Sequence, residues 1–344
     1  MNRRAYLKYM GFLTLAGCGS AVGPLPRSIK FGLGDDPEKM INAYDPDGRR
    51  VLEALKPNIV CTWLNGGRDT SGRIYSPSMD YFREWAVRRR FEEWSSAGYE
   101  LMIITWENYD GQNPLLGSPT FGDYHISAQF LEDLKELLGY LRAQFSKKVY
   151  IALATEQSTY SACRYDRTCA NPLAYSDRVD DVTKEYFQPL RENLLRAIRL
   201  IRQALPTAEV GLCFGGWLVK YPALWEFIYY FERAIEEGNA IFFQSMRNQK
   251  ADEEGYGNPA QILDNCRFFS RWKKPLHLAH YMPSKKRADV VADDLLRMSE
   301  AAYLRELGRY LSSFSFMDYS LPKNNAYDSL QRLKAFRERL MAIP

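Results

Sequence analysis

From residue 29 onward, short apolar runs alternate with longer amphipathic stretches. Most of the runs are nearly continuous in apolar residues, which is typical of parallel strands covered on both faces. Eight runs are therefore predicted as strands, at residues 29–34, 58–64, 100–106, 148–155, 209–214, 240–245, 275–281 and 312–318.

The stretches between these runs have helical periodicity. Helices are predicted at residues 78–97, 126–145, 180–204, 218–237, 259–272, 288–310 and 327–341, with a shorter and weaker one at 49–55. Eight strand-then-helix units in one chain predict a single (β/α)₈ barrel over residues 29–344.

The rival architecture is a doubly wound open sheet. A nucleotide-binding version would carry a glycine-rich turn after its first strand. Residues 32–37 read Gly-Leu-Gly-Asp-Asp-Pro, which lacks the third glycine and places proline where a helix would open on phosphate. We therefore predict no dinucleotide site and expect no cofactor.

The first 17 residues are typical of an export signal. Arg3, Arg4 and Lys8 precede a short apolar run, and residues 15–18 read Leu-Ala-Gly-Cys. This tetrapeptide resembles the lipobox of bacterial lipoproteins, which implies cleavage before Cys18, lipid on its thiol and a tether at residues 18–28. An ordinary signal peptide with a chance cysteine is the alternative. The apolar run is far shorter than the ~20 residues of a transmembrane helix.

A second export signal overlaps the first. Residues 2–8, Asn-Arg-Arg-Ala-Tyr-Leu-Lys, resemble the twin-arginine motif with Asn and Tyr as departures, although both arginines could serve simply as leader charge. Gly19 follows the cysteine where an aspartate would retain a lipoprotein at the inner membrane. We therefore expect an outer-membrane lipoprotein that faces the periplasm or the cell surface.

The charge of the chain excludes a nucleic-acid partner. The chain has 46 Lys and Arg against 42 Asp and Glu, and three of the basic residues belong to the leader. Nothing in this balance suggests the clustered basic surface that nucleic-acid binding would need. Aromatic residues make up 14% of the chain, which suits stacking surfaces for sugar rings as well as a large core. We expect a monomer.

The remaining cysteines form two groups. Cys61, Cys213 and Cys266 lie in apolar stretches and are predicted to be buried thiols. Cys163 and Cys169 bracket a polar segment and could form a disulfide in an oxidising compartment. No metal-binding spacing accompanies them, so no metal site is expected.

Polar and aromatic residues follow the predicted strands, at the barrel end where active sites lie. Carboxylates, amides and aromatic rings dominate, and this composition predicts a carbohydrate site. The candidate substrate-binding residues are Asp35, Trp63, Asn65, Trp106, Asn108, Tyr160, Trp217, Gln244, His280 and Tyr281. The alternative is a structural role, in which the aromatic rings pack in the core and the ring nitrogens of His280 are hydrogen-bonded within the protein.

Glu156 is the first candidate for catalysis. Its alternation with Ala154, Ala152 and Tyr150 predicts that these side chains face the barrel interior, since the other face carries branched residues. A carboxyl group partly desolvated beside aromatic rings could protonate a glycosidic oxygen. The alternative is a glutamate that only hydrogen-bonds neighbouring loops.

Residues 58–160 carry a family resemblance. Met-Ile-Ile-Thr-Trp-Glu at 102–107, Gly-Asp-Tyr-His at 122–125 and Ala-Thr-Glu at 154–156 resemble the middle of family 26 glycoside hydrolases and related barrels. The resemblance implies a retaining β-glycanase whose acid/base glutamate follows the fourth strand, a position that matches Glu156. The family's nucleophile, a glutamate at the end of the seventh strand, has no counterpart in residues 275–283, and Gln157 stands where the family has asparagine.

The second carboxylate is left open among three choices. Asp318, at the end of the eighth run, is the first, because that strand lies opposite the fourth and leaves room for water in an inverting mechanism. Glu107, on the neighbouring strand, is the second, and Asp35 or Asp36 is the third. Two functions are consistent with these residues: a glycoside hydrolase acting on exopolysaccharide or cell-wall glycan, and a catalytically silent barrel that binds polysaccharide.

Overall fold

The computed structural model describes residues 28–42, 44–69, 71–107, 122–161, 179–247 and 256–343. Its centre is a closed barrel of eight parallel strands, which confirms the predicted (β/α)₈ fold. The barrel closes because β1 pairs with both β2 and β9. The strands are β1 (Lys30–Leu33), β2 (Ile59–Arg68), β4 (Glu100–Glu107), β5 (Val149–Leu153), β6 (Glu209–Phe214), β7 (Ile241–Ser245), β8 (Leu276–Tyr281) and β9 (Leu311–Phe316).

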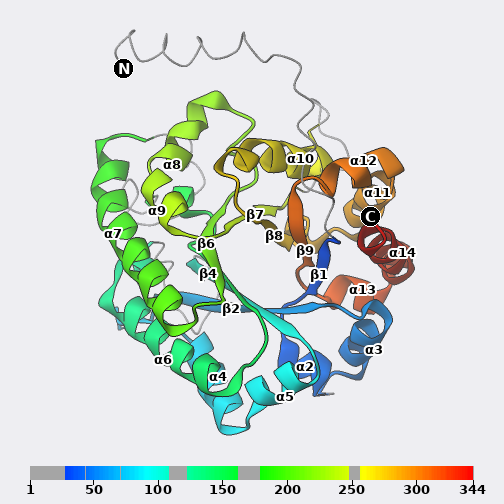
Figure 1. Cartoon of the computed structure of the whole chain (residues 1–344), viewed down its shortest axis with the longest axis horizontal. Coiled ribbons are helices and arrows are strands. Elements are labelled where there is room, and N and C mark those ends of the chain that lie inside the picture. Colours follow the sequence, from blue (N-terminus) through cyan, green and yellow to red (C-terminus); the bar gives the residue numbers. More distant parts are fainter. Residues whose placement is uncertain are drawn as a thin grey trace.

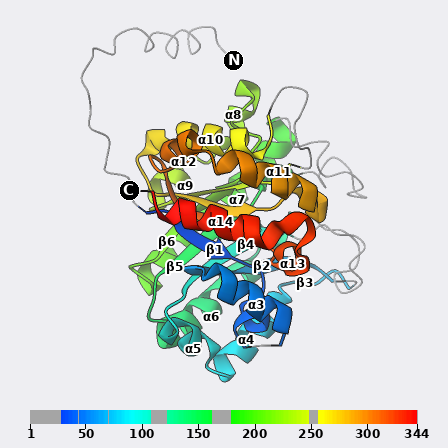
Figure 2. The same ribbon diagram turned by 90° about the vertical axis from the view of Figure 1, so that its right-hand side faces the viewer.

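Helices surround the strands as a ring (Figure 1). They are α2 (Pro37–Ile41), α3 (Pro46–Leu55), α4 (Ser78–Val87), α5 (Arg90–Ser96), α6 (Ala128–Gln144), α7 (Asp181–Ala204), α8 (Trp225–Tyr229), α9 (Glu232–Glu237), α10 (Asn258–Phe269), α11 (Ala288–Met298), α12 (Ala301–Leu307), α13 (Ser320–Asn324) and α14 (Ser329–Met341). Figure 2 shows α14 lying across the outside of β1, and these two elements are in contact.

Local sequence signals explain several helix starts. The Asp45 side chain accepts hydrogen bonds from backbone N–H groups in the first turn of α3. Pro46 suits the first position of this helix because it has no N–H group that would need an acceptor. Ser127 and Asp180 cap α6 and α7 in the same manner. Polar capping residues therefore position the helices that cover the barrel.

Three predicted helices are divided in the structure. The pattern at 78–97 forms α4 and α5, because Arg89 adopts a left-handed conformation with φ of 58°. Residues 218–237 form α8 and α9, and residues 288–310 form α11 and α12, with an extended Glu300 before the latter. The short strand β3 (Ile74–Tyr75) was not predicted, and its antiparallel pairing accompanies the extension of β2 to Arg68.

The barrel has two apolar layers that follow strand alternation. Tyr150 and Ala152 belong to the inner cluster with Met102 and Phe242, as predicted for that face of β5. The branched residues of the other face pack under the helices. Cys61, Cys213 and Cys266 are buried thiols, which confirms that prediction.

Paired charges fill the N-terminal end of the barrel. Lys30 Nζ lies 2.6 Å from Glu100 Oε1, and His277 Nε2 lies 2.6 Å from Glu209 Oε2. Burial raises the pKa of Glu209, but hydrogen bonds from His277 and Lys148 outweigh it and bring that pKa to about 2. The polar side chains at the starts of the strands are thus paired with one another at this closed end. Active sites of such barrels lie at the opposite end, where the strands terminate.

Candidate active site

A cavity of about 610 Å³, here called the inner cavity, lies at the C-terminal ends of the strands. Its volume is within the ~300–1,000 Å³ typical of small-ligand sites. Eight predicted site residues line it together: Asp35, Trp63, Asn65, Trp106, Glu156, Trp217, Gln244 and His280. The sequence interpretation thus placed residues from seven strand ends around a common space.

Glu156 reaches this cavity through an irregular backbone. Strand β5 ends at Leu153, and both Ala154 and Glu156 have positive φ, 52° and 59°. Strand alternation therefore stops before Glu156, and Ala154 belongs to the outer core layer. Such left-handed non-glycine residues are costly and are concentrated at functional sites.

The Glu156 carboxyl group is in a desolvated setting. Burial raises its pKa to about 7, although a hydrogen bond from Gln244 Nε2 to Glu156 Oε1 acts in the opposite direction. Gln244 lies on β7 and is itself buried. A carboxyl group with this pKa is substantially protonated at neutral pH and can donate a proton.

Aromatic rings form one wall of the inner cavity. Trp63 packs edge-on against His280 with centroids 5.1 Å apart and is tilted against Trp106 at 6.1 Å. Burial lowers the pKa of His280 to about 4, so the imidazole is neutral at pH 7. His280 Nδ1 has no hydrogen-bond partner although the residue is only 8% exposed. The wall therefore offers apolar ring faces and one unsatisfied polar atom.

Asp35 and Asp318 are electrostatic neighbours. The backbone N–H of Tyr319 donates to the Gly34 carbonyl at 2.7 Å, which brings the two loops together. Burial, followed by the charge of Asp318, raises the pKa of Asp35. Burial also raises the pKa of Asp318, but hydrogen bonds from Lys286 and Ser320 outweigh it and lower that pKa overall. Asp35 faces the inner cavity, whereas Asp318 forms an ion pair with Lys286 and is not among the lining residues.

Three other predicted residues lie outside the inner cavity. Glu107 is fully buried, and its Oε1 accepts hydrogen bonds from the backbone N–H of His125 at 2.5 Å and from Nδ1 at 3.0 Å. Tyr160 stacks on His125 in the outer core. The Tyr281 hydroxyl group donates a hydrogen bond to Asp294 Oδ2 at 2.8 Å. Glu107 and Tyr281 are the last residues of β4 and β8, and Tyr160 follows β5. Asn108, Cys18, Cys163 and Cys169 are outside the described residues.

Sequence reasoning missed several contributors. Thr155, Met246 and Ser284 also line the inner cavity, and Lys286 is the partner of Asp318. Thr155 immediately precedes Glu156, and Met246 lies two residues after Gln244. Ser284 and Lys286 lie beyond Pro283 in the loop after β8. Their position at the C-terminal end of the barrel depends on the conformation of this loop, which the strand pattern does not predict.

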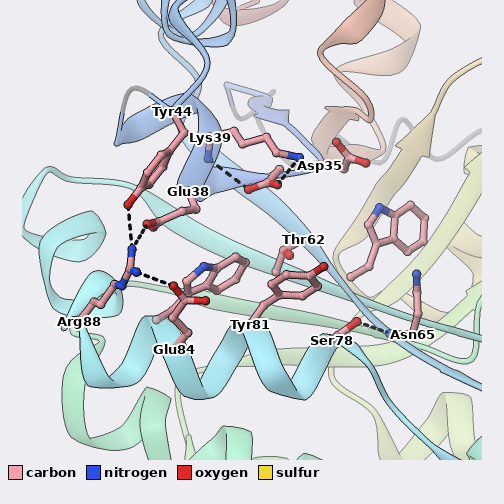
Figure 3. Close-up of a pocket in the computed structure, with 13 residues that line it drawn as sticks. Asp35, Glu38, Lys39, Tyr44, Thr62, Asn65, Ser78, Tyr81, Glu84 and Arg88 are labelled. Atoms are coloured by element: carbon pink, nitrogen blue, oxygen red, sulfur yellow. Dashed lines mark hydrogen bonds and ion pairs between the residues drawn. The ribbon is translucent and has the colours of Figure 1, made fainter. Parts of the chain in front are cut away.

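A second cavity of about 630 Å³, here called the outer cavity, adjoins the first. The two share Asp35, Trp63 and Asn65. Figure 3 shows Tyr81 projecting from α4 midway between Asn65 at one end and Arg88 with Tyr44 at the other. The site is therefore a groove that continues outward between α2 and α4.

Two features are absent from the described ranges. No three His, Cys, Asp or Glu side chains there are grouped as a metal-ligand set. Among the helices of the same ranges, none combines the length and the apolar character needed to cross a bilayer.

Comparisons with known proteins identify structures but no family. No family model matches the chain, and no curated protein matches it. A β-1,4-mannanase of glycoside hydrolase family 113 superposes with a TM-score of 0.51 at 11% identity, over 90% of this chain and 98% of that one. The Cellulomonas fimi endo-β-1,4-mannanase double mutant gives 0.55 at 9% identity, over 90% and 70%.

The β-glycosidase from the hyperthermophile Thermosphaera aggregans gives a TM-score of 0.53 at 9% identity, over 93% of this chain and 98% of that one. At such identities a likeness establishes the architecture alone. The chain thus shares the (β/α)₈ barrel fold with these glycoside hydrolases.

Proposed function

We propose that this protein is a glycoside hydrolase that acts on a polysaccharide at the bacterial cell envelope, with Glu156 as the general acid. The observation that carries the proposal is that Glu156 and Asp35 line the same aromatic-walled cavity. Glycoside hydrolysis commonly uses such a pair of carboxyl groups. The shared barrel fold with mannanases and a β-glycosidase supports the same reaction class.

The proposed chemistry divides the proton transfers between the two carboxyl groups. Glu156 gives its proton to the glycosidic oxygen as the bond from that oxygen to the anomeric carbon breaks. Asp35 takes a proton from a water molecule, whose oxygen then bonds to the anomeric carbon. Asp35 follows β1 and Glu156 follows β5, with two barrel strands between them, which favours a spaced pair and an inverting reaction.

The remaining cavity residues fit a sugar ligand. Trp63, Trp106 and Trp217 offer ring faces against which the apolar face of a pyranose can pack. Asn65 Oδ1 and His280 Nδ1 have no hydrogen-bond partner and can accept from sugar hydroxyl groups. Because two neighbours are β-1,4-mannanases, β-1,4-mannan belongs first in a panel of test polymers.

The pH dependence of hydrolysis tests the role of Glu156. Since the acid must be protonated, kcat/KM should fall as pH rises through about 7. Replacing Gln244 with leucine removes the hydrogen bond that lowers this pKa, so the falling limb should move to higher pH. The measurement is kcat/KM against pH for both proteins.

A surface glutamine provides the control for that experiment. Gln129 on α6 bonds to Asp133 and is not among the cavity-lining residues, so Gln129→Leu should leave the pH profile unchanged. A falling limb that stays in place in Gln244→Leu would show that Glu156 is not the titrating acid.

The envelope location rests on Cys18. Changing Cys18 to serine should abolish incorporation of radiolabelled fatty acid and move the protein from the membrane to the soluble fraction, because acylation requires the thiol. Fractionation and labelling in cells that express each form measure this. Label retained by the serine variant would contradict lipid attachment at this residue.

A further inference from the structure

The outer cavity has features of a ligand site in its own right. Tyr81, on α4, is 60% exposed, and Tyr44 is 58% exposed, so both present apolar ring surface to water inside a concave region. The Asn65 backbone N–H donates to Ser78 Oγ at 3.1 Å, which fixes the first turn of α4 against β2. Tyr81 stands on the next turn of this anchored helix (Figure 3).

The charges of the outer cavity are unsuited to an anionic ligand. Both of its cationic side chains are already paired, Lys39 with Asp36 at 3.0 Å and Arg88 with Glu84 at 2.7 Å. Arg88 also lies 3.8 Å from Glu38. With Asp35, the described lining contains four carboxyl groups and two cations. A chain of uronic acids would meet repulsion here without a free cation to bind.

The two cavities form a single groove. Their shared residues, Asp35, Trp63 and Asn65, come from the ends of β1 and β2. Each cavity alone has the volume of a small-ligand site, so together they exceed what a single small ligand fills. A ligand that occupies both must be extended and must pass Trp63.

We propose that the outer cavity binds additional sugar residues of the same polymer, that these are neutral or amino sugars, and that Tyr81 is their stacking platform. This inference rests on the proposed function for the identity of the ligand as a glycan. It makes the substrate a chain bound along its length, with several sugar residues on one side of the bond that is cleaved.

Affinity electrophoresis of the full chain in gels that contain a polymer tests this binding. β-1,4-Mannan is the neutral probe, chitosan the amino-sugar probe and polygalacturonate the anionic probe. We expect retardation by mannan or chitosan and none by polygalacturonate. Tyr81→Ala should lose roughly tenfold in affinity, whereas Tyr81→Phe, which keeps the ring, should bind as the parent protein does.

Hydrolysis of oligosaccharides of two to six residues gives a second readout. Tyr81→Ala should lower kcat/KM for the hexamer roughly tenfold and leave that for the dimer unchanged, since the dimer does not reach the outer cavity. Retardation by polygalacturonate, absence of retardation in every gel, or equal affinities of Tyr81→Ala and parent would overturn the inference. Retardation that depends on Tyr81 without any hydrolysis would overturn the proposed function and leave the outer-cavity inference standing.

Discussion

Replacing Glu156 with glutamine is expected to lower the turnover of a cleavable glycan by roughly 10²–10⁴-fold, because the variant retains the shape of the side chain but has no proton to donate. Binding should change little, since Gln244 can still bond to the side-chain oxygen. The measurements are kcat on the cleaved polymer and the dissociation constant for the same polymer, compared between variant and parent.

A carboxylate on the outside of α6 supplies the matched control. Glu132 is exposed and is not among the residues that line the inner cavity, so Glu132→Gln should behave as the parent protein does. If Glu156→Gln weakens binding as much as turnover, then Glu156 is a ligand contact, and the catalytically silent polysaccharide-binding barrel becomes the better description.

Replacing Asp35 with asparagine is expected to reduce turnover by a similar factor, because this change removes the group that we propose deprotonates the attacking water. Asp35 faces the inner cavity with its pKa raised by burial and by Asp318, as suits a base that works near neutral pH. Asp318→Asn should have a smaller effect, since the carboxylate of Asp318 is already bound by Lys286 and Ser320.

The anomeric configuration of the first product provides an independent measurement. Proton NMR of the fresh reducing end should show inversion if Asp35 activates water. Retention would instead indicate a covalent intermediate on one carboxylate. A large loss in Asp318→Asn with little loss in Asp35→Asn would restore Asp318 as the second catalytic carboxylate.

The barrel was predictable because its strands are continuous apolar runs. Buried parallel strands tolerate few polar residues, so the positions of β6 and β7 could be read almost residue by residue. The divided helices were less predictable. Arg89 interrupts the pattern of 78–97 through its backbone conformation, and nothing in its side chain signals a left-handed turn.

The site was predictable to the extent that strand ends converge. Proximity to a strand end selected Asp35 and Gln244, which line the inner cavity, and equally Glu107 and Tyr281, which point to the helices. Which face a residue takes depends on where the strand stops. For Glu156 that stop comes early, so its alternation with Ala154 was wrong although its side chain reaches the cavity.

If Cys18 carries a lipid, as we propose, the position of the closed end of the barrel affects how the molecule lies relative to the bilayer. Ser28, the first described residue, precedes Lys30, which lies among the paired charges at that end. The ten residue-to-residue steps from Cys18 to Ser28 span at most roughly 36 Å when fully extended. A lipid on Cys18 would therefore hold the molecule by its closed end and point the groove away from the bilayer. In that orientation the protein meets polymers that approach from the aqueous side.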